Sequence, residues 1–290
     1  MAADYTWLLN GVDLDEASLG LASVTLWRPP ISVRRSPVEV TGRHGSISSK
    51  RPPVFTEPQL VIGFRADQAS QAALEAAITK LAALLAAADL TVTRISGGVS
   101  TSAPAELVSA DMDAGFVPGG FAAPLAILAV PTVFLRQPSD VGGPLPFNAN
   151  LTAAALPHLA GSSAPITDAI VRLKGPHAGL FTITDAATGT GLSQSAASLT
   201  GSQYLYVDAG RFRSWISASD SAWTGVGTDV SANLDYPAAG ILQLWPVVEP
   251  AVGDSSFAAA SAPTVRISAT GGTGRTGDTT LAVYAGRSFL

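Results

Sequence analysis

The 290-residue sequence contains no cysteine and few charged residues. Without cysteine, a disulfide framework and thiolate metal sites are excluded. Charged residues make up 13% of the chain and the net charge is −5, which does not favour non-specific binding to nucleic acid. The first residues have no basic segment, and no run of about 18 apolar residues is unbroken. We therefore expect a soluble protein made in the cytoplasm, without a signal peptide or membrane insertion.

Motifs for catalysis and for metal or cofactor binding are also lacking. The sequence has no GxSxG or HExxH motif, and its three histidines, His44, His158 and His177, lie far apart beside glycine or proline. We expect them to be exposed in loops. Residues 272–277 match GxGxxG, but a strand rather than a helix is expected to follow, so we interpret them as a hairpin loop. We predict no catalytic residue, no metal site, no cofactor and no enzymatic activity.

Apolar residues and turn formers are plentiful. Hydrophobic residues make up 47% of the chain, and 28 glycines and 20 prolines interrupt it. This composition favours short strands and turns over long helices. The length predicts two domains. Residues 137–165 lose all periodicity and contain five prolines, so we predict an N-terminal domain at 1–140, a linker at 141–165 and a C-terminal domain at 166–290.

The first domain is predicted to be α+β, with one helix from residue 68 to residue 87. Asp67 is the expected N-cap. Apolar residues recur at spacings of three and four, which predicts one buried helix face formed by Leu74, Ile78, Leu81, Leu85 and Ala88. Alternating or β-branched runs predict strands at 5–9, 19–27, 60–64, 90–95, 106–112 and 126–135.

The second domain is predicted to be entirely β. Expected strands are at 169–174, 180–184, 204–207, 211–217, 241–248, 264–269 and 280–285. Asp208-Ala209-Gly210 between two aromatic strands is typical of a hairpin turn. Short strands at this spacing predict an antiparallel sandwich of jelly-roll or galectin-like type, and strand number does not distinguish the two. The fold class is therefore mainly β.

Residues 39–64 contain a long polar excursion between two strands. The turn Gly42-Arg43-His44-Gly45 leads into a basic stretch that ends at Pro52-Pro53. Such a long stretch is usually functional or disordered, and two prolines cannot pair as a central strand. Residues 28–51 carry six arginines and lysines against one glutamate, a local charge of +5 in a protein of −5. This contrast favours self-association of complementary surfaces.

The order of these features resembles the first domain of siphophage distal tail proteins, hub proteins that join the tail tube to the tail tip. The features are an N-terminal strand pair, a Gly-Arg-x-Gly turn, a long arm and a returning strand. The arm is the basic stretch described above, which follows the turn and ends at Pro52-Pro53. The ending TVRISATGG…LAVYAGRSFL looks like the terminal hairpin of actinobacteriophage minor tail proteins. The predicted sandwich extends the resemblance over nearly the whole chain.

The resemblance implies a ring-forming (belt) domain followed by a galectin-like β-sandwich. It implies a homohexameric ring in the virion, assembled in the host cytoplasm, with tail tube protein on one face and the central tail-tip protein on the other. Tail fibres or host glycan are further possible partners. The predicted function is thus a structural distal tail hub, and the alternative is a carbohydrate-binding module of a tail or cell-surface adhesion apparatus.

Two groups of residues are candidates for contacts. We predict a subunit interface in the arm, with a solvated basic loop as the alternative interpretation. Its residues are Arg43, His44, Lys50, Arg51, Pro52 and Pro53.

Arg211, Arg213 and Trp215 form the second group, because their spacing puts them on one strand face. One hypothesis is a platform on which a sugar ring stacks. In the alternative, Phe212 and Ile216 face the core while the first three residues cover a domain or subunit contact.

Overall fold

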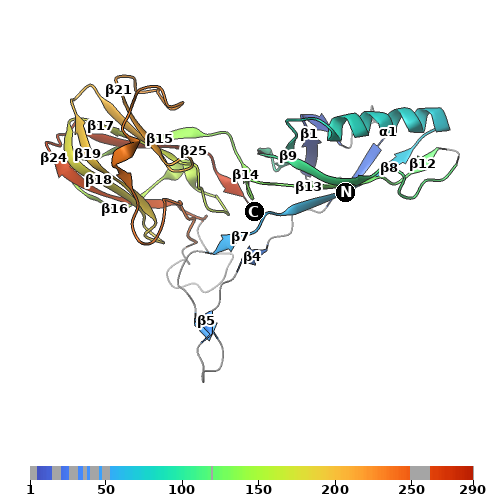
Figure 1. Ribbon diagram of the computed structural model, residues 1–290, viewed down its shortest axis with the longest axis horizontal. Helices are drawn as coiled ribbons and strands as arrows, with labels where there is room; N and C mark the ends of the chain where they lie inside the picture. Colours follow the sequence, from blue (N-terminus) through green and yellow to red (C-terminus); the bar gives the residue numbers. More distant parts are fainter. Residues whose placement is uncertain are drawn as a thin grey trace. The chain divides into compact units, whose positions relative to one another are not determined.

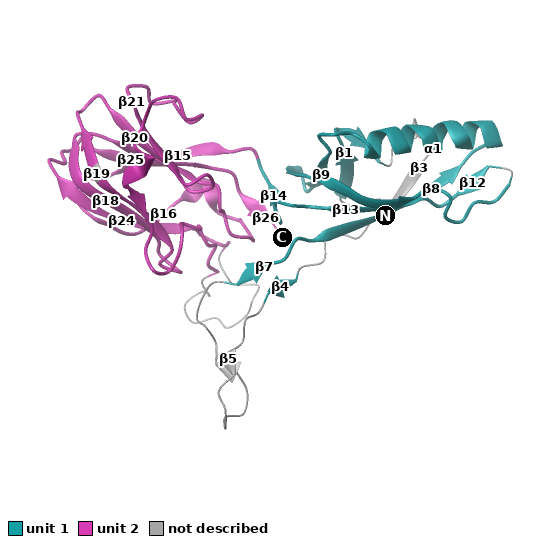
Figure 2. Ribbon diagram, in the orientation of Figure 1, with its two compact units in different colours: residues 1–137, 290 teal, residues 138–289 magenta. Residues whose placement is uncertain are grey.

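The structure is a computed structural model of the chain, and it describes residues 5–14, 21–25, 32–34, 38–39, 46–47, 53–118, 120–248 and 262–289. The chain divides into two compact units, shown in different colours in Figure 2. Unit 1 comprises Met1–Gln137 with Leu290, and unit 2 comprises Pro138–Phe289. Unit 1 thus ends at Gln137, whereas the sequence predicts the end of the first domain at residue 140. The described part of the chain is mainly β with one α-helix, as expected.

Unit 1 contains two larger antiparallel sheets (Figure 1). Asn10 and Gly11 have positive φ and form the tight turn between the first two strands of the first sheet. Trp7 and Leu9 contribute to the core from this sheet. Its strands within unit 1 lie in the order β2 (Val12–Asp13), β1 (Tyr5–Leu9), β9 (Thr91–Ser96), β10 (Val99–Pro104) and β14 (Leu135–Arg136).

The second sheet of unit 1 is built around its longest strand, β8 (Gln59–Asp67). Alternate residues of β8, Leu60, Ile62, Phe64 and Ala66, are buried, whereas Val61 and the other intervening residues are exposed or half-buried. The sheet order is β11 (Glu106–Asp111), β13 (Leu125–Ala129), β8 and β12 (Phe121–Ala122), and β3 (Leu21–Thr25) also pairs with β8. Two short ribbons, β4 (Val33–Arg34) with β7 (Val54–Phe55) and β5 (Val38–Glu39) with β6 (Ser46–Ile47), complete the unit.

The helix α1 (Gln71–Leu85) packs against β8 and β12 and buries one face. The buried residues are Leu74, Ala77, Leu81 and Leu85, which follow the predicted spacing. The prediction of Asp67 as the N-cap is wrong, because Asp67 is the last residue of β8. The N-cap is Ser70, whose Oγ accepts a hydrogen bond from the Ala73 N–H at 3.3 Å. The helix is therefore shorter than predicted at both ends, and Ala88 lies outside it and is exposed.

Unit 2 is an antiparallel β-sandwich, which confirms the predicted fold class. Val171 and Leu205 from one sheet and Phe181 and Ile267 from the other belong to one buried core. The first sheet has the order β15 (Asp140–Pro146), β25 (Thr280–Ala285), β17 (Ile170–Lys174), β20 (Tyr204–Asp208), β21 (Arg213–Ser217) and β22 (Thr228–Asp229). The second has the order β16 (Leu151–Ala155), β24 (Arg266–Thr273), β18 (His177–Asp185), β19 (Gly191–Leu199) and β23 (Leu234–Asp235). Two short 3₁₀ helices (Pro157–Leu159 and Ser231–Asn233) and β26 (Ser288–Phe289) complete the described elements.

The predicted linker at 141–165 is wrong. Most of its first half consists of β15 and β16, which pair with β25 and β24 in the two sheets of the sandwich. Pro144 is accommodated because β15 is an edge strand with a register shift between Gly142 and Leu145. The loss of periodicity in this stretch therefore reflects an irregular edge strand of unit 2.

The predicted strand at 241–248 is also wrong. Ile241, Leu244 and Val247 each form an isolated bridge with a different segment, so this stretch does not join a ladder. Pro246 has no N–H to donate to one. The hairpin at 208–210 is confirmed, because β20 and β21 pair from Tyr204↔Ser217 to Asp208↔Arg213.

Candidate interaction surfaces

Most of the predicted arm interface lies outside the described residues. This applies to Arg43, His44, Lys50, Arg51 and Pro52, while Pro53 is described and exposed. The arm interface therefore stays a prediction.

The base of the arm is a defined ribbon formed by β4 and β7. Val33 pairs with Phe55 and Arg34 with Val54. The N–H of Thr56 also donates to the Ser32 carbonyl at 2.9 Å. The Phe55 ring meets Phe134 edge to face, with centroids 5.3 Å apart, so the ribbon is attached to unit 1 through this side chain. Its other face carries Arg34 and Val54, and the Val54 side chain is 61% exposed.

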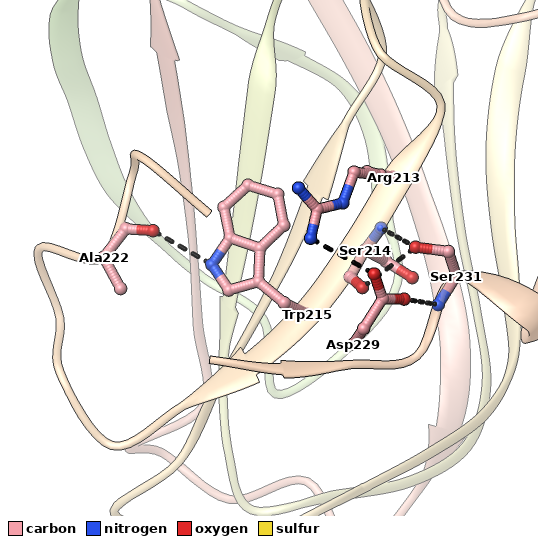
Figure 3. Close-up of polar contacts among 6 residues, drawn as sticks. All are labelled: Arg213, Ser214, Trp215, Ala222, Asp229 and Ser231. Carbon is pink, nitrogen blue, oxygen red and sulfur yellow. Dashed lines mark hydrogen bonds and ion pairs between the residues drawn. The ribbon is translucent and has the colours of Figure 1, made fainter. Parts of the chain in front are cut away.

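Trp215 does not offer an exposed platform, so the sugar-stacking hypothesis for it is wrong. Its side chain is 2% exposed and its ring stacks on Tyr206, with centroids 5.4 Å apart. The indole N–H donates a hydrogen bond to the Ala222 carbonyl at 2.9 Å (Figure 3). Ile216, on the other face of β21, and Phe212, in the turn before it, pack against the sandwich core, as the alternative interpretation predicted.

The two arginines of this group are engaged differently. Arg213 pairs with Asp229 at 3.2 Å (Figure 3), and the Ser231 N–H also donates to Asp229 at 2.9 Å. Hydrogen bonds from Ser231, together with Arg213, lower the pKa of Asp229. Arg211 remains largely exposed, 4.0 Å from the Asp208 carboxylate. Arg213 and Trp215 thus share a face of β21, whereas Arg211 precedes the strand, so the three predicted residues do not form one recognition surface.

Residues 218–224 fold over the outer face of the sheet and cover Trp215. The Tyr206 hydroxyl donates to the Ser219 carbonyl at 2.7 Å and accepts from the Ala222 N–H at 3.2 Å. Trp223 meets Tyr206 edge to face at 5.2 Å and stacks on Tyr284 at 5.1 Å. The burial that results raises the pKa of Tyr206. This face of the sandwich is closed by its own chain, which the spacing of residues along the strand did not reveal.

Two of the three histidines, His158 and His177, are not exposed as we expected. His44 lies outside the described residues. His177 is 2% exposed within β18, where its ring centroid lies 6.5 Å from that of Phe147 and 6.2 Å from that of Phe181, and burial lowers its pKa. His158 is half-buried and its pKa is lowered for the same reason. Within the described ranges no group of histidines and carboxylates is arranged to hold a metal ion, and no helix is long and apolar enough to cross a membrane.

Unit 1 exposes the full length of an edge strand. All six residues of β11 are exposed, including the apolar side chains of Leu107 and Val108. In the described part of the chain β11 pairs only with β13, so its other edge presents unpaired N–H and C=O groups. Val61 and Leu125 are also exposed on this sheet. Such an edge is a template for pairing with another chain.

A groove of about 740 Å³ lies between α1 and the segment that follows β11, and we call it the α1 groove. Leu74 and Ile78 of the helix and Met112 and Phe116 of the segment form its apolar walls. Glu75 lines it from the helix, with Gln71 Nε2 donating to its Oε1 at 3.1 Å, and Asp113 lines it from the segment. The α1 groove is therefore apolar with carboxylates at its margin.

The chain has the fold of a phage tail hub protein. The Dit protein (gp 19.1) of phage SPP1, described as a paradigm of the hub adsorption apparatus in phages that infect Gram-positive bacteria, superposes with a TM-score of 0.54 and 15% identity over 99% of each chain. This confirms the resemblance to siphophage distal tail proteins at the level of the fold.

Two further structures are similar at a lower level. Chains of the phage P2 baseplate in its activated conformation, with Ca and with Sr, superpose with a TM-score of 0.41 and 7% identity over 97% of this chain. The two superpositions cover 98% and 97% of the baseplate chains, respectively. The sequence matches no family model and no curated protein.

Proposed function

We propose that this chain is a structural subunit of a siphophage tail tip. Copies form a closed hub ring that joins the tail tube to the tip, and the protein is part of the virion after assembly in the host cytoplasm. The observation that carries the proposal is the likeness in fold to the SPP1 hub protein, which extends over 99% of both chains. The resemblance in sequence order supports six copies, with the tail tube protein and the central tip protein on opposite faces.

The exposed surfaces of unit 1 support an assembly role for it. An edge strand such as β11, which pairs on one side only among the described strands and exposes Leu107 and Val108, favours pairing between chains. A contact between two different surfaces of the same subunit repeats from copy to copy, and it generates a ring when the rotation closes. The function is then mechanical connection rather than catalysis.

Trp215 does not provide the exposed platform on which the carbohydrate-binding alternative depends. Stacking of a sugar requires an exposed aromatic face, and the ring of Trp215 is buried against Tyr206 and the 218–224 segment. The hub proposal is therefore preferred.

Sedimentation velocity and native mass spectrometry of the purified chain test the proposal. We expect a discrete species of about six copies that appears as a ring in negative-stain electron micrographs. Leu107→Lys with Val108→Lys is expected to weaken assembly while leaving the circular dichroism spectrum unchanged, because both side chains are exposed. Val226→Lys, at a 69% exposed position of unit 2, is the matched control. A chain that stays monomeric at all concentrations and binds immobilised glycan would support the alternative.

A further inference from the structure

We infer that the α1 groove of one copy holds the β4–β7 ribbon of a second copy. This inference rests on the proposed function, since it names the contact that repeats around the hub. It is carried by the chemistry of the two surfaces and by their separation within one subunit.

The ribbon presents one cation beside one apolar side chain. Because Arg34 and Val54 are directly opposite each other, they share a face, and Phe55 is on the other face against Phe134. Arg34 is exposed and Val54 is 61% exposed. A ribbon of two residues per strand has no core in which to bury Val54. A partner surface complementary to this face would combine an apolar region with a neighbouring negative charge.

The α1 groove offers that combination. Its apolar walls include Ile78, Met112 and Phe116, and Phe116 is 46% exposed. Glu75 and Asp113 are exposed carboxylates that line the groove. Among the described residues, neither carboxylate forms an ion pair. The ribbon face and the groove are therefore complementary in both apolarity and charge.

A subunit cannot fill its own groove with its own ribbon. The groove includes Ala122 of β12, and β12 pairs with Ala66 and Asp67 at the end of β8. The ribbon strand β7 precedes the first residue of β8, at the other end of that strand. Nine residues of extended chain span roughly 30 Å, at about 3.3 Å per residue. Figure 1 shows β7 and β12 at the two ends of β8.

The occupant is therefore a neighbouring copy, and each copy gives a ribbon and receives one. Since the groove and the ribbon are different surfaces, the contact is heterologous and propagates in one direction. That is the kind of contact from which a closed ring is built.

Charge reversal at each surface tests the inference. Glu75→Lys and Arg34→Glu are each expected to raise the concentration at which the ring forms by about tenfold or more at low ionic strength, since each places like charges across the contact. The chain carrying both substitutions is expected to regain assembly, because the reversed charges again face each other. Lys80→Glu, which reverses an exposed charge of α1 away from the groove lining, is the control.

Mixing the two single variants gives an independent test. The groove of the Glu75→Lys copy matches the ribbon of the Arg34→Glu copy, and the remaining groove and ribbon keep their native charges. Equal mixtures should therefore form alternating rings that neither variant forms alone, as measured by sedimentation and native mass spectrometry. Single variants that assemble like the wild type, or a double variant and a mixture without recovery, would overturn the inference while the hub proposal stands. A wild-type chain that does not assemble would instead contradict the hub proposal.

Discussion

Replacing Asp185 with alanine is expected to lower the free energy of unfolding of unit 2 by about 3 kcal/mol. The side chain is 1% exposed. One carboxylate oxygen, Oδ2, accepts hydrogen bonds from the Ala187 N–H at 3.1 Å and from the Thr188 N–H and hydroxyl, both at 2.8 Å. The other, Oδ1, accepts from the Trp245 N–H at 3.0 Å. One side chain thus joins the turn after β18 to a segment that belongs to no sheet.

The magnitude follows from what each donor loses. The Thr188 hydroxyl also lies 2.8 Å from the Thr190 hydroxyl, so it keeps a partner. Three backbone N–H groups remain, and each net hydrogen bond contributes about 1 kcal/mol. Burial raises the pKa of Asp185, and the hydrogen bonds to its carboxylate act in the opposite direction. Keeping this buried side chain charged therefore costs free energy. Asp185→Asn, which keeps one acceptor oxygen without the charge, should therefore destabilise less than alanine.

Urea denaturation at neutral pH followed by pulse proteolysis measures this effect, because the surviving fragment of unit 2 is recognised by its mass. Asp278→Ala removes an exposed carboxylate from the same unit and should change the free energy by less than about 0.5 kcal/mol. If Asp185→Ala and Asp278→Ala shift the midpoint equally, the hydrogen-bonded role of Asp185 is refuted.

Three further predictions concern the core, the unit boundary and pH. Leu81→Ala truncates a fully buried residue and should cost unit 1 about 2–5 kcal/mol, whereas exposed Lys80→Ala should be nearly silent; similar melting shifts would contradict this. A fragment of residues 138–290 should show β-type circular dichroism and melt cooperatively, and residues 166–290, which lack β15 and β16, should not; equal folding of both would be evidence against the boundary. Because burial lowers the pKa of His177, the unfolded chain binds more protons than the folded chain as the pH falls. The urea midpoint of unit 2 should therefore decrease below about pH 6.5, and a midpoint that does not change with pH would exclude this.

Sequence pattern predicted the elements that carry a clear apolar period or an apolar, β-branched run. The bounds expected for β1 and β25, residues 5–9 and 280–285, are those of the structure. The helix followed its apolar spacing, with Leu74, Leu81 and Leu85 buried. In β1 and the helix a local period reports burial directly, because one face meets the core, whereas β25 buries adjacent residues on both faces.

Strands without that period were missed. β16 reads Leu-Thr-Ala-Ala-Ala, and β19 is mainly serine, alanine and glycine, so neither has a strong β propensity. Both are strands because distant partners supply hydrogen bonds: Ala154 pairs with Ile267, and Phe181 with Gln194. Sequence-local reasoning has no access to such pairing. The Asn10-Gly11 turn, by contrast, carried a readable hairpin signal that our prediction did not use.

The candidate surfaces show the same limit. The spacing of Arg213 and Trp215 correctly placed them on one face of β21, but it gave no sign that residues 218–224 cover that face. For the α1 groove, the helix pattern predicted Ile78 as part of the buried stripe, and it is half-buried at the groove. Its second wall, including Met112 and Phe116, is contributed by the segment that follows β11. Only the fold brings the two together.

One sheet face of unit 2 is covered by its own chain, whereas the edge strand and the groove of unit 1 are open, and this contrast bears on where assembly takes place. Unit 2 closes the outer face of its sheet with Trp223 and with hydrogen bonds to Tyr206 and Trp215. Unit 1 leaves Val108 on an edge that no described strand pairs with, and Phe116 beside an open groove. Exposed edges and apolar patches favour aggregation unless a partner covers them. For the edge of β11 and for the α1 groove, the hub proposal supplies that partner as the next copy.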